Sequence, residues 1–367
     1  YMLWKKVLRR VRKFYYKNFM ARKIKIANKF VGTGYPVFII AEAGVNHNGS
    51  LNSAKKIVDA AKEAGADAVK FQTFKAEDVT TKTAELAEYQ KKNIEKNETQ
   101  LEMIKKLELS YEDFRKLKNY CDKKQIIFLS TPHSEDAANF LESLVVAYKI
   151  GSGDLTNLPL LEGVAQKKKP MILSTGMSGL REIREAVKLI KKNGNKEIVL
   201  LHCTTNYPCP INEVNLKAMA TLKKEFDLPV GYSDHTKGFL APVMAAALGA
   251  QIIEKHFTLD KKLPGPDHKA SQEPKGFKKM VCMVREAEKI MGSATKKPTE
   301  GEKKIMKIVR KSIVAKIEIK AGQIIKKEML DLKRPGTGIE PKHINRIIGR
   351  KAKINIKEDQ LINWKDL

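Results

Sequence analysis

The sequence predicts an α/β protein in which a closed (β/α)8 barrel is followed by a small β-rich domain. From about residue 37, short runs rich in Val and Ile alternate with helical patterns of 10–15 residues. Eight such strand–helix units over about 250 residues match the size of this barrel. After about residue 296 the pattern changes to short β-like segments. An open doubly wound sheet is the alternative, but no Gly-rich dinucleotide-binding loop follows the first expected strand.

The expected strands are short apolar runs, and most of them end on polar residues. They cover residues 37–43, 67–72, 126–131, 146–151, 171–176, 197–203, 229–234 and 251–257. The helical patterns cover 51–64, 111–124, 135–143, 158–167, 180–193, 215–225, 239–248 and 277–291. A charged, helical insertion over 76–110 follows the second strand, and loops at this position lie over the active face of a barrel.

We expect four segments along the chain. Residues 1–22 form a basic N-terminal extension, 23–295 form the TIM barrel, 296–304 ("KKPTEGEKK") form a polar linker, and 305–367 form the β-rich domain. A domain of roughly 60–70 residues cannot build a large core, so we expect this one to pack on a neighbour.

The net charge of +28 is concentrated at the two ends of the chain. Residues 1–30 carry 11 Lys or Arg and no acid, and residues 296–367 carry a further +11. No zinc-finger spacing and no base-stacking aromatic motif accompanies these charges, so we expect no nucleic-acid partner. Charges spread over solvated faces are the simpler interpretation.

The location of the protein is predicted from its apolar runs and its cysteines. No apolar run approaches the roughly 20 residues of a membrane-spanning helix. Residues 1–20 alternate apolar and basic side chains at helical spacing, a pattern that allows contact with an anionic membrane surface. Upstream sequence or a misassigned start explains this extension equally well. The 4 Cys form no CxxC pair, which favours a reducing, cytoplasmic compartment.

Polar residues at the ends of the expected strands predict an anion-binding site. Catalytic groups of a barrel emerge from these strand ends, and Lys70 and Lys149 lie at two of them. Buried unpaired cations cost several kcal/mol, so a ligand with more than one negative group is the natural partner. Structural ion pairs are the alternative. The turns 150–154 ("IGSGD") and 173–178 ("LSTGMS") add N–H and hydroxyl groups that can hold oxyanions.

Two histidines indicate a metal site at the same end of the barrel. His235 and His256 end the seventh and eighth strands, which places two imidazoles on one rim with coordination positions left open. The alternative is a pair of hydrogen-bonded core histidines. His133, His202 and His268 are weaker candidates for lining the site. His47 stays unassigned.

Eight ordered motifs resemble the bacterial N-acetylneuraminate (sialic acid) synthase family. They are "FIIAEAGVNHNGS", "AVKFQTF", "AYKIGSGDLTNLP", "MILSTGMS", "LLHCTTNYP", "GYSDHT", "IIEKHFTLD" and "GPDHKAS". The resemblance runs from about residue 23 to the C-terminus, and the tail with "LKRPGTGI" is similar to the family's antifreeze-like (SAF) domain. One departure is "TPHS", with His133 where such enzymes commonly have an aromatic residue after the proline.

The resemblance implies that phosphoenolpyruvate condenses with N-acetylmannosamine and water and that phosphate is released. It implies a divalent metal on His235 and His256, usually manganese, with magnesium or cobalt as alternatives. Glu42 matches an acid at the reacting centre and, with Lys70 and Lys149, makes up the expected catalytic set. The residues that match phosphoenolpyruvate contacts are Lys70, Gln72, Thr131, Lys149, Ser152 and Ser174. Those that match the sugar pocket are Tyr207, Asp267 and Arg334, the last reaching across a homodimer with swapped SAF domains.

Two other functions stay open from the sequence. The first is the same reaction with 2,4-diacetamido-2,4,6-trideoxymannose as acceptor, which gives N,N'-diacetyllegionaminate. The second, from another class, is a non-catalytic anion- or nucleic-acid-binding protein, which would show steeply salt-dependent binding.

Overall fold

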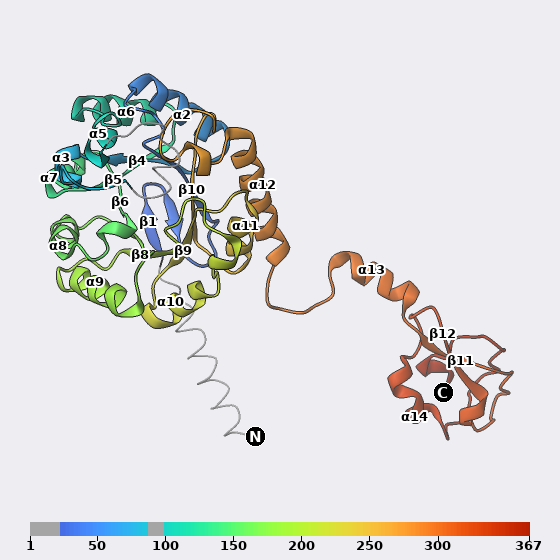
Figure 1. Ribbon diagram of the computed structural model, residues 1–367. Helices are drawn as coiled ribbons and strands as arrows, with labels where there is room; N and C mark the ends of the chain where they lie inside the picture. Colours follow the sequence, from blue (N-terminus) through green and yellow to red (C-terminus); the bar gives the residue numbers. More distant parts are fainter. Residues whose placement is uncertain (1–22, 87–98) are drawn as a thin grey trace. The chain divides into compact units, whose positions relative to one another are not determined.

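In the computed structural model, which describes residues 23–86 and 99–367, the chain folds as the predicted barrel with a separate C-terminal unit (Figure 1). Eight parallel strands pair in the order β5-β4-β3-β10-β9-β8-β7-β6, and β5 and β6 also lie against each other, which closes the ring. The strands are β3 (Phe38–Gly44), β4 (Ala68–Thr73), β5 (Ile127–Pro132), β6 (Tyr148–Ile150), β7 (Met171–Ser174), β8 (Ile198–His202), β9 (Val230–Asp234) and β10 (Ile252–His256). The predicted fold class is confirmed.

The strands are buried on both faces, which explains their near-continuous apolar sequences. Side chains that point into the barrel, such as Phe38, Ile40 and Ile172, form an inner core. Their neighbours along the strands, such as Ile39 and Leu173, point outward into a second core beneath the helices. Some buried strand positions belong to neither core, among them Lys70, Lys149 and Glu254, and these positions carry polar side chains.

Eight helices surround the barrel, each following one strand (Figure 1). They are α2 (Leu51–Glu63), α6 (Tyr111–Lys123), α7 (Glu135–Leu141), α8 (Leu158–Gln166), α9 (Leu180–Lys192), α10 (Ala218–Phe226), α11 (Leu240–Ala247) and α12 (Pro274–Met291). Several begin where a serine side chain accepts a hydrogen bond from a backbone N–H of the first turn, as Ser50, Ser110 and Ser134 do. Each helix lies close to its predicted range.

A short hairpin that the sequence analysis missed fills the N-terminal end of the barrel. β1 (Ile24–Ile26) pairs antiparallel with β2 (Lys29–Val31). Ile24, Ile26 and Val31 are buried and join the inner core of the barrel. Three-residue strands are too short to give a periodic signal, so the local sequence did not reveal them.

The predicted insertion over 76–110 contains two short helices in the part that the structure describes. It contains α3 (Ala76–Val79) and α5 (Gln100–Lys105), and its residues 87–98 lie outside the described range. Phe74, Leu86, Met103 and Leu107 form a small apolar cluster together with Val45, which follows β3. The insertion therefore has its own apolar packing near the C-terminal ends of β3 and β4.

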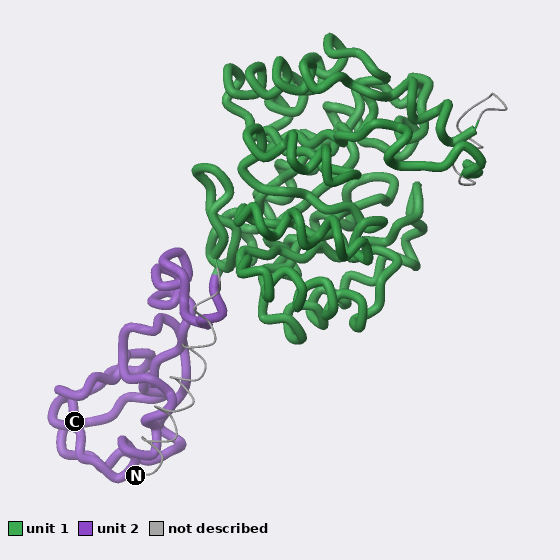
Figure 2. Tube along the Cα trace, turned by 90° about the vertical axis from the view of Figure 1, so that its left-hand side faces the viewer, with its two compact units in different colours: residues 1–292 green, residues 293–367 purple. Residues whose placement is uncertain are grey.

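The chain divides into two compact units between Gly292 and Ser293 (Figure 2). In the second unit β11 (Ser312–Ala315) pairs antiparallel with β12 (Leu330–Lys333), and a core of its own forms around residues such as Ile313, Ile325 and Ile356. One expectation is corrected here. The segment 296–304 is not a linker throughout, because α13 (Glu300–Val309) begins inside it with Thr299 as its N-cap. The "TxxE" capping box that starts this helix was present in the sequence.

The basic amphipathic pattern over residues 1–20 lies outside the described residues, as does the whole extension 1–22. Within residues 23–86 and 99–367 no helix is long and apolar enough to cross a membrane.

The hairpin gives a stability prediction. Ile26 is fully buried in the inner core, so Ile26→Ala should lower the free energy of unfolding by about 2–5 kcal/mol, because it removes apolar contacts and leaves a cavity. Urea denaturation followed by circular dichroism measures this change. Lys25→Ala on the exposed face of the same strand is the control and should leave stability within about 0.5 kcal/mol. Equal stability of both variants would show that the barrel does not depend on its hairpin.

Candidate active site

A cavity of about 260 Å³ opens at the C-terminal ends of the barrel strands. Almost every strand contributes a polar side chain to its lining: Glu42 from β3, Lys70 from β4, Thr131 from β5, Lys149 from β6, Ser174 from β7, Ser233 from β9 and His256 from β10. These positions are brought together by the parallel register of the sheet and not by closeness in sequence. The cavity therefore collects polar groups from strands all around the barrel.

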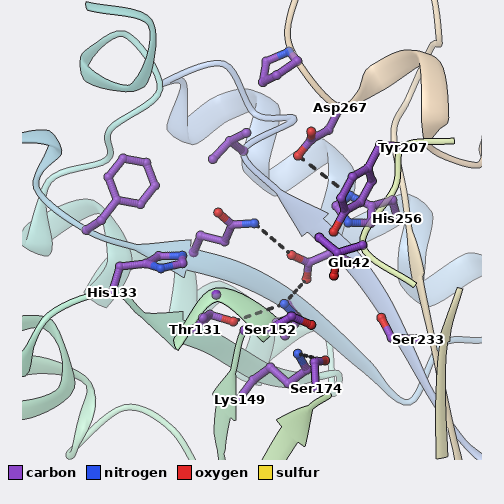
Figure 3. Close-up of a pocket in the computed structure, with 18 of the residues that line it drawn as sticks. Glu42, Thr131, His133, Lys149, Ser152, Ser174, Tyr207, Ser233, His256 and Asp267 are labelled. Atoms are coloured by element: carbon purple, nitrogen blue, oxygen red, sulfur yellow. Dashed lines mark hydrogen bonds and ion pairs between the residues drawn. The ribbon is translucent and has the colours of Figure 1, made fainter. Parts of the chain in front are cut away.

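Four buried ionisable residues line the cavity, and we call them the charged floor: Glu42, Lys70, Lys149 and Glu254. Figure 3 labels two of them, Glu42 and Lys149. Lys70 Nζ lies 2.6 Å from Glu42 Oε2, and Lys149 Nζ lies 3.5 Å from Glu254 Oε1. Glu254 also lies 4.0 Å from Lys70. Both lysines therefore have a carboxylate beside them, as in the structural ion pairs that were the alternative from the sequence, and both also line the cavity.

Burial and charge pairing shift the pKa values of the charged floor in different directions. Burial raises the pKa of Glu42 to about 7, although Lys70 opposes the shift. Burial would also raise the pKa of Glu254, but Lys149 and Lys70 outweigh it and hold that pKa below its usual range. Burial lowers the pKa of Lys149. Glu42 is thus the member of the floor that can bind or release a proton near neutral pH.

Hydroxyl and amide groups surround the two lysines. Lys149 donates a hydrogen bond of 2.7 Å to Ser174 Oγ, and Lys70 donates one of 3.2 Å to Thr131 Oγ1. Gln72 donates to Glu42 Oε1, while Ser152 Oγ accepts a hydrogen bond of 3.1 Å from the backbone N–H of Gly176. The predicted anion-binding residues therefore all lie in one cavity, with N–H, O–H and ammonium donors suited to phosphate and carboxylate oxygens.

His235 and His256 line the same cavity, with ring centroids 5.5 Å apart, and His256 is paired with Glu42 in the sheet register. Burial lowers the pKa of both imidazoles, so both rings are neutral. His235 donates its Nδ1 proton to the backbone oxygen of Thr204 over 2.6 Å, which leaves Nε2 with a lone pair. His256 Nδ1 is buried, has no hydrogen-bond partner and lies 3.9 Å from Asp267 Oδ2.

These features fit a divalent cation. Neutral imidazole nitrogens with available lone pairs are suitable metal ligands. His256 Nδ1 is a buried nitrogen of this kind without a hydrogen-bond partner. In the part of the chain that the structure describes, no group of three or more His, Cys, Asp or Glu side chains is arranged to hold a metal ion. A cation here would therefore have few protein ligands and would leave positions open for substrate and water.

The two expected sugar-pocket residues of the barrel lie beside the histidines. The ring of Tyr207 is 4.2 Å from that of His235 and 5.4 Å from that of His256, measured between centroids. Asp267 lines the same side, and burial raises its pKa to about 6 (Figure 3). Arg334 belongs to the second unit, where it is exposed at the end of β12.

A further buried ion pair holds the end of the strand that precedes His235. Lys255 contacts Asp234, and both side chains are almost fully buried. Asp234 also accepts hydrogen bonds from the Tyr232 hydroxyl at 2.9 Å and from Thr236. This network fixes the end of β9, so that the residue after it is delivered to the cavity in one position.

The weaker histidine candidates separate into two groups. His133 lines the cavity. His202 and His268 do not, since His202 Nε2 donates to the backbone oxygen of Val214 and His268 Nδ1 pairs with Thr258 Oγ1. The unassigned His47 is buried and accepts a hydrogen bond from the N–H of Gly49. His47 and His268 are buried histidines with local partners, while His202 is half-buried and lies outside this cavity.

Sequence reasoning missed part of the lining. Glu254 received no role from the sequence, although it shares a face of β10 with His256 two residues later. An apolar wall was missed entirely: Val45, Phe74, Val79, Met103, Ile104 and Leu107. Most of these belong to the insertion, where a charged helical pattern concealed the few apolar residues that face the cavity.

Two family models and several known proteins match this chain. The model of the NeuB family matches residues 57–296, and that of the SAF domain matches residues 310–367. An N,N'-diacetyllegionaminic acid synthase from Legionella pneumophila is 51% identical over 341 residues, which cover 92% of this chain and 96% of that protein. The human N-acetylneuraminate-9-phosphate synthase is 37% identical over 337 residues, covering 91% and 93% of the two chains.

A solved structure agrees with the fold. The crystal structure of N-acetylneuraminic acid synthetase from Leptospira borgpetersenii in complex with citrate superposes with a TM-score of 0.70 at 37% identity. The match covers 78% of this chain and 95% of that one.

Proposed function

The chain belongs to the NeuB family of phosphoenolpyruvate-dependent condensing synthases, and we propose that it joins phosphoenolpyruvate to 2,4-diacetamido-2,4,6-trideoxymannose. The products are N,N'-diacetyllegionaminate and inorganic phosphate. The observation that carries the proposal is the cavity itself, which two buried lysines and two neutral histidines line together.

The sequence alone left two candidate acceptor sugars. N-acetylmannosamine was the first of them, and the diacetamido sugar was the alternative. The Legionella diacetyllegionaminic acid synthase is 51% identical to this chain, against 37% for the human sialic acid 9-phosphate synthase. Similarity of this size over nearly the whole of each chain supports the diacetamido acceptor.

The charged floor would bind phosphoenolpyruvate. Its phosphate and carboxylate require several donors, and Lys70 and Lys149 would contribute charge-assisted hydrogen bonds to them. Thr131, Ser152 and Ser174 would donate neutral hydrogen bonds, as would Gln72. Because Lys149 and Ser174 are already 2.7 Å apart, these donors are held in place before the ligand arrives, which lowers the cost of ordering them.

The reaction requires one carbon–carbon bond to form and one carbon–oxygen bond to break. The methylene carbon of phosphoenolpyruvate attacks the aldehyde carbon of the open-chain sugar, and water adds to the cationic carbon that results. Glu42, whose pKa is raised to about 7, would hold this water and accept its proton. Collapse of the tetrahedral intermediate breaks the carbon–oxygen bond and releases phosphate.

His235 and His256 would hold a divalent cation, which we take to be manganese, with magnesium or cobalt as alternatives. When bound, such an ion polarises the aldehyde oxygen of the acceptor and stabilises the negative charge that develops there. Tyr207 and Asp267 lie beside the two rings and would align the sugar at that position.

We also propose a cytoplasmic location, because all four cysteines are free thiols. Cys121, Cys203 and Cys209 are buried and Cys282 is exposed. A reducing compartment keeps an exposed thiol of this kind from forming intermolecular disulfides.

A panel of acceptors tests the proposed function. Phosphate release should require both phosphoenolpyruvate and an N-acetylated sugar, and kcat/KM should be higher for 2,4-diacetamido-2,4,6-trideoxymannose than for N-acetylmannosamine. Treatment with a chelator should abolish turnover, and manganese should restore it. His256→Ala should fold normally and stay inactive after manganese is added, since a residue on the rim contributes little to the core.

Two outcomes would contradict this assignment. Higher kcat/KM with N-acetylmannosamine would return the function to sialic acid synthesis. No phosphate release with either sugar, together with binding of DNA or RNA that weakens steeply with salt, would indicate a non-catalytic anion-binding protein.

We propose further that the active unit is a homodimer with swapped SAF domains. Arg334 is exposed in the second unit, and its guanidinium would donate to an acetamido carbonyl in the cavity of the other subunit. The family resemblance of "LKRPGTGI" and the SAF match over residues 310–367 support this assignment.

Mixing two inactive variants tests the swapped dimer. Arg334→Ala and Glu42→Ala each remove one group from every site, so each variant alone should lose most activity. After subunit exchange, mixed dimers contain one site with both residues intact, and phosphate release should recover to about a quarter of the wild-type rate from statistical pairing. An Arg334→Ala variant with unchanged sugar kinetics, or a fully active monomer, would rule the swap out.

A further inference from the structure

His133 lines the cavity and has no role in the proposed reaction. Its Nδ1 atom lies 3.1 Å from Asp154 Oδ2, and a carboxylate can only accept, so the ring donates its Nδ1 proton there. In the neutral ring this leaves Nε2 as a hydrogen-bond acceptor. The side chain of His133 is 23% exposed, which keeps it accessible from the cavity that it lines.

Two contacts hold the His133 ring in this orientation. Asp154 is itself fixed, because its other oxygen accepts a hydrogen bond of 3.3 Å from the Asn157 side chain. The ring of Phe74 meets that of His133 edge-on, with centroids 6.0 Å apart and an interplanar angle of 68°. His133 therefore presents a positioned acceptor next to the apolar wall.

The apolar wall continues from Phe74 through Val79, Met103, Ile104 and Leu107. Figure 3 shows His133 on one side of the cavity and His256, Tyr207 and Asp267 on the other, with Glu42 between them. The cavity thus has one side suited to a polarised oxygen and one suited to methyl groups next to an acceptor.

The orientation of the sugar follows from these two sides and rests on the proposed function. If the aldehyde end lies at His235 and His256, the opposite end of the six-carbon chain extends toward His133 and the apolar wall. The diacetamido sugar carries an acetamido group at C4 and a methyl group as C6. N-acetylmannosamine carries hydroxyl groups at both positions.

We propose that His133 and the apolar wall form the subsite that distinguishes the diacetamido sugar from N-acetylmannosamine. The His133 Nε2 atom accepts the N–H of the 4-acetamido group, and the wall packs against the acetyl methyl and C6. The acetyl group excludes water from this subsite, so His133 is the acceptor on which the acetamido N–H depends for its hydrogen bond. The smaller 4-hydroxyl leaves room for water, which can replace that acceptor.

The expected preference for one sugar over the other, expressed as a ratio of kcat/KM values, follows from general limits on enzyme specificity. Each methyl group buried in an apolar pocket changes kcat/KM by about 10- to 200-fold, and an unpaired buried N–H adds a penalty of its own. We therefore expect the wild-type preference for the diacetamido sugar to be at least roughly 10-fold.

Two variants separate the polar and apolar parts of this subsite. His133→Phe keeps an aromatic ring against Phe74 but removes the acceptor. Val79→Thr keeps the side-chain shape and replaces one methyl group by a hydroxyl. Val146→Thr is the matched control, because Val146 has the same 38% exposure as Val79 and does not line the cavity.

The experiment measures kcat/KM for both sugars at saturating phosphoenolpyruvate, with phosphate release as the readout. The ratio of the two values should fall by about 10- to 100-fold in His133→Phe, mainly through loss of diacetamido turnover, and by a smaller factor in Val79→Thr. The ratio should not change in Val146→Thr. The KM for phosphoenolpyruvate should remain at the wild-type value in all three, because the charged floor is untouched.

An unchanged ratio in both His133→Phe and Val79→Thr would overturn the proposed subsite while leaving the proposed function standing, provided that the wild-type protein prefers the diacetamido sugar. Wild-type protein that turns over neither sugar, or prefers N-acetylmannosamine, would instead show failure of the proposed function. A parallel loss of turnover with both sugars in His133→Phe would also overturn the subsite, because it would assign His133 to a contact common to both acceptors.

Discussion

The burial of four ionisable side chains at the mouth of the barrel is the constraint on which the rest of the site depends. Removing two cations and two carboxylates from water costs several kcal/mol for each charge unless they are paired at close range. Lys70 with Glu42 and Lys149 with Glu254 meet this requirement. The same pairing keeps both ammonium groups in the cavity, where an incoming phosphate and carboxylate can share them.

Separate parts of the fold supply the two sides of the cavity. Strand ends carry the charged floor and the histidines, so their positions are fixed by the sheet register and by buried networks such as Lys255 with Asp234. The apolar wall comes mostly from the insertion after β4, a connection that can vary without disturbing the barrel. This arrangement would keep the condensation chemistry constant while the choice of acceptor is set by the insertion and by His133.

The barrel and most of its site could be predicted because both follow simple local rules. Strands buried on two faces are continuously apolar, and a polar residue at their end, such as Lys149, is conspicuous. His202 shows the limit of this rule: it ends β8, but its ring pairs with the backbone of Val214 outside the cavity. The pairing of Glu254 with Lys149 could not be predicted, because it depends on contacts across the barrel and not on sequence distance. The hairpin β1–β2 gave no periodic signal, and the start of α13 was concealed within a polar segment.

The most direct test of the charged floor is calorimetric titration of phosphoenolpyruvate into the intact protein without acceptor. Lys70→Met and Lys149→Met, each verified as folded by circular dichroism, should weaken binding by about 10- to 100-fold, because each loses a charge-assisted contact. Lys303→Met, at an exposed lysine of α13, should bind as the wild type does. Unchanged affinity in both Lys70→Met and Lys149→Met would contradict the account, because the buried lysines would then be structural ion pairs and no more.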